Sequence, residues 1–319
     1  MAPTRTSSQV FLNQAASSEG RSQLYVDLLT AWADDPVAAE IVGPDPAWDA
    51  PLRLIGGLHY LVLGGEASWD DPLSEHAEFL REFVATHGVQ TNEVQRSWVL
   101  VPLLLRVAQR MDAQTFDLVE LGPSAGLNLV WDRYRYRYEA GEWGREDALL
   151  GFDGDERRPV PGELLELHPT VGRRIGIDLA PIDVTTEHGA RLLRSFVWAG
   201  QDERMRRLDR AIEALREDPP ELVQGDYVEA LPEVMAAQST DALTIVFQTA
   251  SFGFIGDEGR ARVRSVLEEI GESRSLAFIS TGQPRDGEDW GLRIVYWPGG
   301  EREFAGHADI HGSWLSWEL

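Results

Sequence analysis

The 319-residue sequence contains no cysteine and no lysine. The lack of cysteine excludes disulfide bonds, cysteine-ligated metal sites and thiol catalysis. The longest apolar run, residues 98–105, is less than half of the length that a membrane span needs, and residues 1–20 lack the apolar core of a secretory signal. These absences predict a cytoplasmic protein without a membrane partner.

Basic residues are also scarce, because 29 arginines stand against 53 acidic residues and the formal net charge is -24. The acidic excess is spread along the chain: residues 1–115 carry 7 arginines and 15 acids, and the other 204 residues carry 22 and 38. Binding to a phosphate backbone requires a clustered basic surface. We therefore expect no nucleic-acid partner, and a solvated acidic surface typical of a GC-rich or halophilic host.

Apolar residues recur at helical spacing in the first 115 residues. They indicate four amphipathic helices, whose apolar positions fall within residues 24–32, 52–62, 73–84 and 94–108. Asp71 and Asn92 are placed to begin the third and fourth helix. From residue 116, short apolar strands alternate with helices, which predicts a mostly parallel sheet with helices on both faces. The sequence thus predicts an α/β protein with a helical cap domain, residues 1–115, and a sheet domain, residues 116–319.

Seven strands are expected in the sheet domain, and the last two are expected to form an antiparallel C-terminal pair. The seven cover residues 116–121, 175–177, 222–224, 242–247, 276–280, 292–297 and 314–318. Residues 131–172 form an insertion between the first two strands. Tyrosine and arginine alternate over residues 133–138, a pattern that leaves strand and helix open. Trp131 and Trp143 of the insertion are placed to form an aromatic lid over a ligand.

The clearest local motif follows the first strand and reads Glu-Leu-Gly-Pro-Ser-Ala-Gly-Leu-Asn over residues 120–128. Gly122 allows a sharp turn, and the small Ser124 allows a ligand to approach the backbone. Gly126 allows the next helix to pack closely, so a ligand would meet backbone N–H groups and a helix N-terminus. Glu120 is placed to hold a cationic amino group. The loop also contributes Pro123 and Asn128 to the candidate binding site.

Two kinds of chemistry compete for this motif. One is a loop that binds a nucleoside cofactor. The other is the nucleophile elbow G-x-S-x-G of a serine hydrolase, with Ser124 as nucleophile, Asp257 or Asp286 as acid, and His307 or His311 as base. An elbow strand normally has several strands before it in the chain, whereas everything before the first strand here is helical. This placement favours the nucleoside interpretation.

Further polar residues end the next three strands. Asp178, followed by Leu179, is placed to bind ribose hydroxyls, and Asp226, followed by Tyr227, is placed near an adenine amino group. Gln248 ends the fourth strand, where the reacting carbon would lie. Each is common as a turn or helix cap, but acids at successive strand ends indicate one binding site.

Several blocks of the sequence resemble known families. The turn and the downstream acids resemble class I S-adenosylmethionine-dependent methyltransferases, although Ser124 stands where the middle glycine usually is. More specific blocks, which resemble an uncharacterised prokaryotic family named domain of unknown function 2332, are residues 89–94, 126–129, 131–136, 178–183 and 311–314. The resemblance covers about residues 15 to 318. It implies a Rossmann-like methyltransferase fold with a helical N-terminal part and brings no assigned reaction.

The resemblance makes S-adenosylmethionine the expected cofactor and a small molecule the expected substrate. Its sulfonium activates the neighbouring carbons, so an enzyme has mainly to align a nucleophile and exclude water. Methyl transfer is the first expectation; aminocarboxypropyl transfer, cyclisation of the cofactor and binding without catalysis stay open, as does a homodimer. The candidate catalytic residues are Gln248, His311 and Tyr134. Asn92 is a further candidate at the methionine end of the cofactor, in a crevice between cap and sheet.

His307, Asp309 and His311 share one face if residues 307–311 are extended, a set that is able to bind iron or zinc. An edge strand with polar residues explains the same pattern. We expect no metal site, and a role for His311 as a base or substrate contact.

Overall fold

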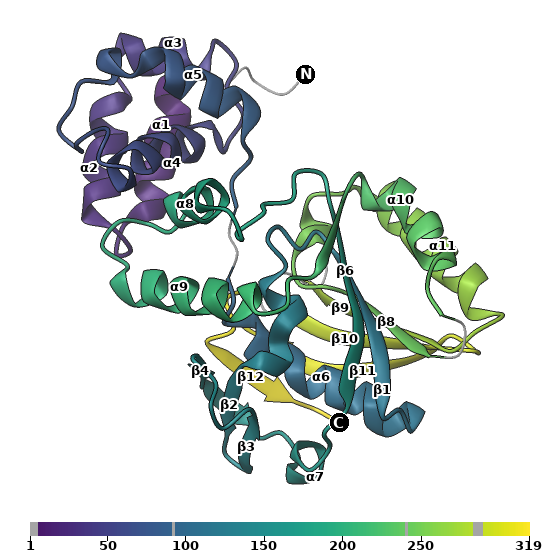
Figure 1. Ribbon diagram of the computed structural model, residues 1–319. Helices are drawn as coiled ribbons and strands as arrows, with labels where there is room; N and C mark the ends of the chain where they lie inside the picture. The colour runs from purple at the N-terminus through teal and green to yellow at the C-terminus, as the bar shows by residue number, and fades with distance from the viewer. Residues whose placement is uncertain (1–5, 91–92, 240–241, 283–289) are drawn as a thin grey trace. The chain divides into compact units, whose positions relative to one another are not determined.

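The computed structural model describes residues 6–90, 93–239, 242–282 and 290–319. The chain divides into two compact units (Figure 1). The helical unit contains residues 1–91 and 182–209, and the sheet unit contains residues 92–181 and 210–319. The predicted boundary at residue 115 differs from this division, because the fourth predicted helix is grouped with the sheet and residues 182–209 are grouped with the first helices.

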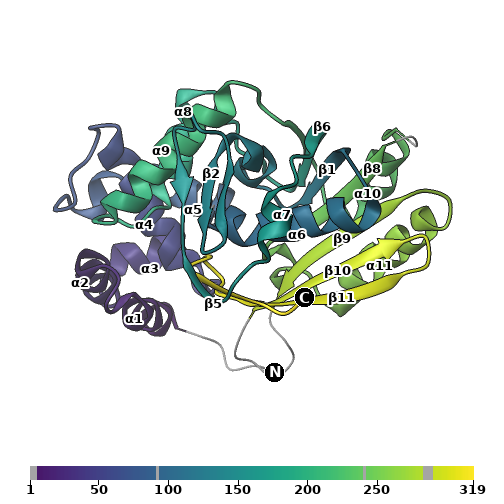
Figure 2. The same cartoon turned by 90° about the horizontal axis from the view of Figure 1, so that it is seen from below.

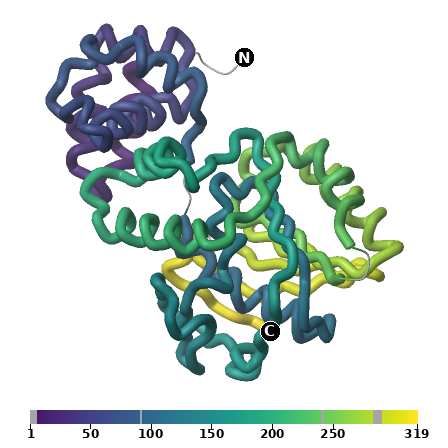
Figure 3. The backbone as a smooth tube through the Cα atoms, in the orientation of Figure 1, coloured from purple at the N-terminus to yellow at the C-terminus, as the bar shows by residue number. Residues whose placement is uncertain are grey.

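The helical unit is assembled around a central apolar helix, α4, which contacts α1, α3, α5 and α8. Figure 3 shows the chain path of the helical unit, in which α8 comes from a later part of the sequence than α1 to α5. Its helices are α1 (Ser7–Ser18), α2 (Gln23–Trp32), α3 (Pro36–Val42), α4 (Ala50–Leu63), α5 (Ala77–Thr86) and α8 (Glu187–Ser195), with a 3-10 turn η1 (Leu73–Glu75) and the start of α9 (Asp202–Arg216).

The predicted helices within residues 24–32 and 52–62 are confirmed as α2 and α4. The predicted third helix is broken at His76, where η1 ends and α5 begins. Asp71 does not cap it: its carboxylate accepts a hydrogen bond from the Ser68 N–H at 2.7 Å, three residues earlier. Helices α1 and α3 were not predicted, because one has a polar sequence and the other is short.

The sheet unit is built on one large mixed sheet. Its strand order is β5-β12-β11-β10-β9-β8-β1-β6-β7. Five strands run parallel to one another: β7, β6, β1, β8 and β9. Strands β6 and β7 lie on one side of β1, and β8 and β9 lie on the other, so the strand order reverses at β1. The strands are β1 (Thr115–Leu121), β5 (Asp155–Arg158), β6 (Thr170–Asp178), β7 (Glu221–Gln224), β8 (Leu243–Gln248), β9 (Leu276–Gly282), β10 (Trp290–Trp297), β11 (Glu301–Ala308) and β12 (Trp314–Trp317).

Both faces of the parallel part are covered by helices. Val119 and Leu121 of β1 belong to the apolar cluster formed with α10 (Tyr227–Ala236) and α11 (Asp257–Gly271). Side chains alternate across a strand, so Phe116 and Glu120 point to the opposite face. There Phe116 stacks on Trp131, and α6 (Arg96–Met111) packs on β9 and β10. The fourth predicted helix is therefore confirmed as α6, and its apolar residues are buried in the sheet unit.

The prediction of seven strands was wrong, because the described residues form a sheet of nine. Strand β11 lies between β10 and β12, so these two do not form the predicted antiparallel pair; each pairs with β11 instead. Figure 2 shows β9, β10 and β11 in succession. The outer strand β5 comes from the insertion and pairs with β12. The coarser prediction of an α/β fold with a mostly parallel sheet is confirmed.

The insertion forms a small sheet with an aromatic interior. Its strands are β2 (Arg135–Tyr138), β3 (Gly141–Gly144) and β4 (Gly151–Phe152), and a short helix α7 (Gly162–Leu165) follows. The second part of the tyrosine and arginine alternation, residues 135–138, forms strand β2, in which both tyrosines are buried and both arginines are exposed. Trp131 and Trp143 are buried and stack on one another with ring centroids 4.7 Å apart. The predicted aromatic lid was therefore wrong, since both rings are already covered by protein.

This packing makes Trp131 a main support of the sheet unit. We predict that Trp131→Ala lowers the free energy of unfolding by about 3–5 kcal/mol, because the ring fills a core between Phe116 and Trp143. Urea unfolding monitored by circular dichroism measures the loss. Trp48→Ala is the matched control, because 54% of that side chain is exposed, and we expect it to change stability by no more than about 0.5 kcal/mol. Equal losses in both variants would contradict this account.

Candidate functional site

The turn after β1 has the backbone shape that its glycines predict. Gly122, Ser124 and Gly126 all have positive φ, at 74°, 58° and 80°. A Cβ atom at Gly122 would lie 2.6 Å from the Cβ of Ser251, in the loop after β8. Gly122 is therefore required both by its conformation and by the close approach of that loop.

The segment that follows the turn differs from the prediction. It is a 3-10 helix, η2 (Leu127–Arg133), with non-helical dihedral angles at Val130. The Ser124 N–H already donates to Oδ2 of Asp178 at 2.8 Å. The turn is thus not followed by the regular α-helix N-terminus that a ligand was expected to meet, and one of its N–H groups is already used within the protein.

Glu120 is the buried acid of the site. Its side chain is 2% exposed, and its Oε2 has no hydrogen-bond partner among the described residues. Burial raises the pKa of Glu120 to about 8, the hydrogen bond with Asn128 and the charge of Arg96 lower it, and the charge of Asp178 adds to the rise. The Oδ1 of Asn128 is a second buried oxygen without a partner there. When the Glu120 carboxyl is ionised, these two oxygens are unpaired acceptors, and they are then suited to a ligand that carries several N–H donors.

Arg96 is a site residue that the sequence analysis missed. It begins α6, and its Nε donates to the carbonyl of Ile310 at 2.7 Å. It also lines a cavity of about 20 Å³, together with Thr249 and Thr281 at the ends of β8 and β9. That volume suffices for one water molecule. The only signal in the sequence was a charge directly before the long apolar run.

Asp178 ends β6 and Asp226 follows β7, and a backbone hydrogen bond joins these two neighbouring strand ends. The Gly225 N–H donates to the backbone carbonyl of Asp178 at 2.8 Å, which joins the two strand ends. The Asp178 carboxylate accepts from the N–H groups of Ser124 and Ala180, so it holds the glycine turn against β6. Asp226 is exposed and caps α10 through the Val228 N–H at 2.9 Å. Capping is thus an observed role of Asp226, besides the predicted one.

Leu179 and Tyr227 follow these acids and have different environments. Leu179 is 69% exposed at the end of β6. Tyr227 is buried, and its hydroxyl donates to the carbonyl of Ser251 at 3.2 Å. The Ser251 hydroxyl in turn donates to the carbonyl of Leu121 at 2.6 Å. These two bonds join the end of β1, the start of α10 and the loop after β8.

Two of the candidate catalytic residues lie in the protein interior. Gln248 is fully buried, and its amide donates to Ser280 and Thr281 and accepts from the N–H groups of Ala250 and Phe252. Tyr134 is fully buried as well, and its hydroxyl donates to the carbonyl of Leu127 at 2.9 Å. Burial raises its pKa far above the usual range. Both side chains therefore have structural roles in the described site.

The segment containing His311 is a turn. Strand β11 ends at Ala308, and the Asp309 carboxylate accepts from the His311 N–H at 3.0 Å. Nε2 of His307 lies 3.8 Å from Oε1 of Glu318, the residue directly after β12. Residues 309–311 are therefore not extended, so the condition under which His307, Asp309 and His311 would share one face is not met. The carbonyl of Gly312 accepts from the side chain of Gln95 at 3.3 Å, which brings His311 to the start of α6.

The hydrolase alternative finds little support in these contacts. Asp257 is exposed and pairs with Arg260 on its own helix at 3.5 Å. His307 faces Glu318, as described above. Asp286 and the cofactor candidate Asn92 lie outside the described residues.

Glu93, the residue after Asn92, is buried in the segment that leads into α6. Its carboxylate accepts a hydrogen bond from the Gln95 N–H at 3.2 Å.

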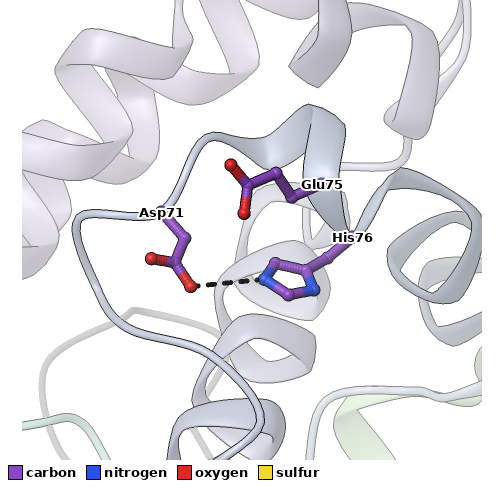
Figure 4. Close-up of side chains that lie close together, drawn as sticks. All are labelled: Asp71, Glu75 and His76. Atoms are coloured by element: carbon purple, nitrogen blue, oxygen red, sulfur yellow. Dashed lines mark hydrogen bonds and ion pairs between the residues drawn. The ribbon is translucent and has the colours of Figure 1, made fainter.

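One cluster of potential metal ligands occurs in the described residues, and it belongs to the helical unit (Figure 4). Asp71, Glu75 and His76 bring their ligand atoms within 4.8 Å of one another. The Asp71 carboxylate is already engaged by the Ser68 N–H and by His76 Nε2 at 3.4 Å. We interpret these contacts as hydrogen bonds that stabilise the turn before α5.

The fold and the strand-end residues together define an α/β protein whose candidate site lies at the carboxyl ends of a parallel sheet. The chain belongs to the family of uncharacterised proteins conserved in bacteria that is named domain of unknown function 2332 (DUF2332), whose model matches residues 8–317. The resemblance predicted from the sequence is confirmed at this level. A search of curated proteins finds no match. None of the described helices is long and apolar enough to cross a membrane.

The buried Glu120 carboxyl predicts a characteristic pH dependence of stability. Its pKa is about 8 in the folded protein and near 4.5 in the unfolded chain, so between these values the folded state holds a proton that the unfolded state has lost. Wild-type stability should therefore fall as the pH rises from about 5 to 8, by up to about 1.4 kcal/mol per pH unit.

Glu120→Gln removes this titration and keeps the shape of the side chain. We expect the stability of Glu120→Gln relative to the wild type to increase as the pH rises over the same window, measured by urea unfolding at several pH values. Glu258→Gln, at an exposed position of the same unit, controls for the loss of one negative charge. A constant difference between Glu120→Gln and the wild type would show that Glu120 does not hold its proton in the folded state.

Proposed function

We propose that the protein binds S-adenosylmethionine at the carboxyl ends of β1, β6 and β7 and transfers its methyl group to a small molecule. The observation that carries the proposal is the pair of buried, unpaired oxygens, Oε2 of Glu120 and Oδ1 of Asn128, beside a turn with three positive φ angles. The strand order supports the placement, because ligands of such sheets bind where the order reverses, and it reverses at β1.

The methionine end of the cofactor fits the two unpaired oxygens. Its amino group offers several N–H donors, and a charge-assisted hydrogen bond to Glu120 is stronger than a neutral one. Binding of a cationic group also stabilises the ionised form of a carboxyl that burial otherwise keeps protonated. Glu120 would thus hold the amino group, with Asn128 as a second acceptor.

The nucleoside end would lie over the exposed strand ends. Each carboxylate oxygen of Asp178 accepts one backbone N–H and keeps capacity for a second donor, such as a ribose hydroxyl. The exposed Leu179 offers an apolar surface next to it. Asp226 lies at the same end of the sheet, because the preceding residue, Gly225, is hydrogen-bonded to Asp178. The cavity beside Arg96 is too small for a nucleoside, so it is not part of this proposal.

The cofactor supplies an activated carbon next to a sulfonium, and an amine or carboxylate acceptor needs no strong base to attack it. The protein's task is then to hold the cofactor and to position the acceptor. This division fits a site whose Gln248 and Tyr134 are occupied by internal hydrogen bonds. Attack on the aminocarboxypropyl chain would use the same binding residues, and it is the second candidate reaction.

Ligand-dependent stabilisation tests the binding proposal. A ligand at one hundred times its Kd should stabilise the folded state by about 2.7 kcal/mol. We therefore expect S-adenosylmethionine and S-adenosylhomocysteine to raise the melting temperature of the wild type. Glu120→Gln should weaken both ligands about 10- to 100-fold, because a hydrogen bond to a charged group is lost. Glu258→Gln should bind like the wild type, and no shift with either ligand in the wild type would rule the proposal out.

The products of the reaction separate the candidate activities. Incubation with S-adenosylmethionine and a cell extract, followed by mass spectrometry, should yield S-adenosylhomocysteine if a methyl group is transferred. Methylthioadenosine would instead indicate attack on the aminocarboxypropyl chain. Binding without either product would mean a cofactor-binding protein. Labelling of the wild type but not of Ser124→Ala by a fluorophosphonate probe would contradict the transferase and support the hydrolase alternative.

A further inference from the structure

The most exposed large apolar side chain of the described residues is Phe254, which is 79% exposed. It lies in the loop between β8 and α11. Phe252, two residues earlier in the same loop, is buried in the core of the sheet unit. The loop thus uses one aromatic ring for packing and presents the other to solvent.

Several hydrogen bonds fix the backbone that carries Phe254. The Gln248 side chain accepts from the N–H groups of Ala250 and Phe252 at 3.0 and 3.3 Å. The Phe252 carbonyl accepts from Nε of Arg260 at 2.9 Å. The Phe254 N–H itself donates to the carbonyl of Ser251 at 2.9 Å. The exposed ring is therefore presented by a constrained loop and not by a free chain end.

This loop is attached to the candidate site at Ser251. The Ser251 hydroxyl donates to the carbonyl of Leu121, and its Cβ would be 2.6 Å from a Cβ placed on Gly122. A hydrogen bond between residues three apart closes a tight turn, whose end Cα atoms lie within about 7 Å of one another. Phe254 is thus one such turn away from Ser251, the residue that approaches Gly122 beside the reversal of strand order at β1.

The two tryptophans that were expected to cover the site have other positions in the described structure. Trp131 and Trp143 are buried against one another, so neither ring is available to a ligand. An exposed aromatic face attracts a cation through its quadrupole. The proposed cofactor carries a permanent cation, its sulfonium, while the product of methyl transfer is a neutral thioether.

We propose that Phe254 faces the sulfonium of bound S-adenosylmethionine and makes the site prefer the charged cofactor to its neutral product. The inference rests on the proposed function, since it assigns a residue to the same site. A cation over an exposed ring gives a preference of about 2- to 5-fold. Such a preference helps the protein to release S-adenosylhomocysteine in exchange for fresh cofactor.

Calorimetric titration with S-adenosylmethionine and with S-adenosylhomocysteine tests this assignment without any turnover. Phe254→Leu keeps an apolar side chain and removes the ring, and it should weaken S-adenosylmethionine about 2- to 5-fold while leaving the Kd of S-adenosylhomocysteine unchanged. Phe254→Trp should keep or increase the preference, because indole is the better cation–π partner. Phe304→Leu, on β11 and 38% exposed, is the control and should bind both ligands like the wild type.

Each other outcome has a distinct meaning. Equal weakening of both ligands by Phe254→Leu would place the ring against the shared adenosine part and overturn the proposal. An unchanged pair of Kd values would show a surface residue outside the site and would also overturn it. If the wild type binds neither ligand, the proposed function itself fails. A melting temperature of free Phe254→Leu close to that of the wild type confirms that the variant is folded.

Discussion

The carboxyl end of β1 is the constraint on which the rest of the site depends. Later strands of the chain are added on both sides of β1, with β6 on one side and β8 on the other, so the chain after β1 has to turn between the ends of these two strands. Asp178 holds the turn from one side through the Ser124 N–H, and Ser251 approaches Gly122 from the other. Positive φ at three positions of the turn makes this narrow passage possible. The same passage buries Glu120 and leaves one of its oxygens without a partner.

The features that were predicted from the sequence are local ones. Strand β1, its glycine turn and the acids at the ends of β6 and β7 are encoded by short apolar runs followed by turn residues, and these patterns do not depend on distant partners. Strand β11 was missed, because its first half is charged and exposed and its pairing depends on β10 and β12. Of the alternation over residues 133–138, only residues 135–138 form a strand, and burial of its tyrosines within the insertion decides this.

In the candidate site, too, the features that depend on distant residues were not predicted. The sequence identifies which residues end the strands, but the direction of their side chains is set by packing. Gln248 follows the predicted strand and yet turns its amide into the sheet, where Ser280 and Thr281 accept its hydrogen bonds. The charge of Arg96 lowers the pKa of Glu120, because α6 packs on the face of the sheet to which Glu120 points. No spacing along the chain relates these two residues.

The acidic composition has a specific consequence at one position. Among the described acidic residues, Glu120 and Asp132 each have a buried side-chain oxygen without a hydrogen-bond partner. Of these two, Glu120 lies at the carboxyl end of a strand, and it carries the central claim. A crystal structure of the protein with bound S-adenosylhomocysteine tests that claim most directly. The account predicts that the ligand's amino nitrogen lies within hydrogen-bond distance of Glu120 Oε2 and Asn128 Oδ1, with the ribose beside Asp178. A ligand bound away from β1, or an amino group facing solvent while Glu120 stays unpaired, would contradict it.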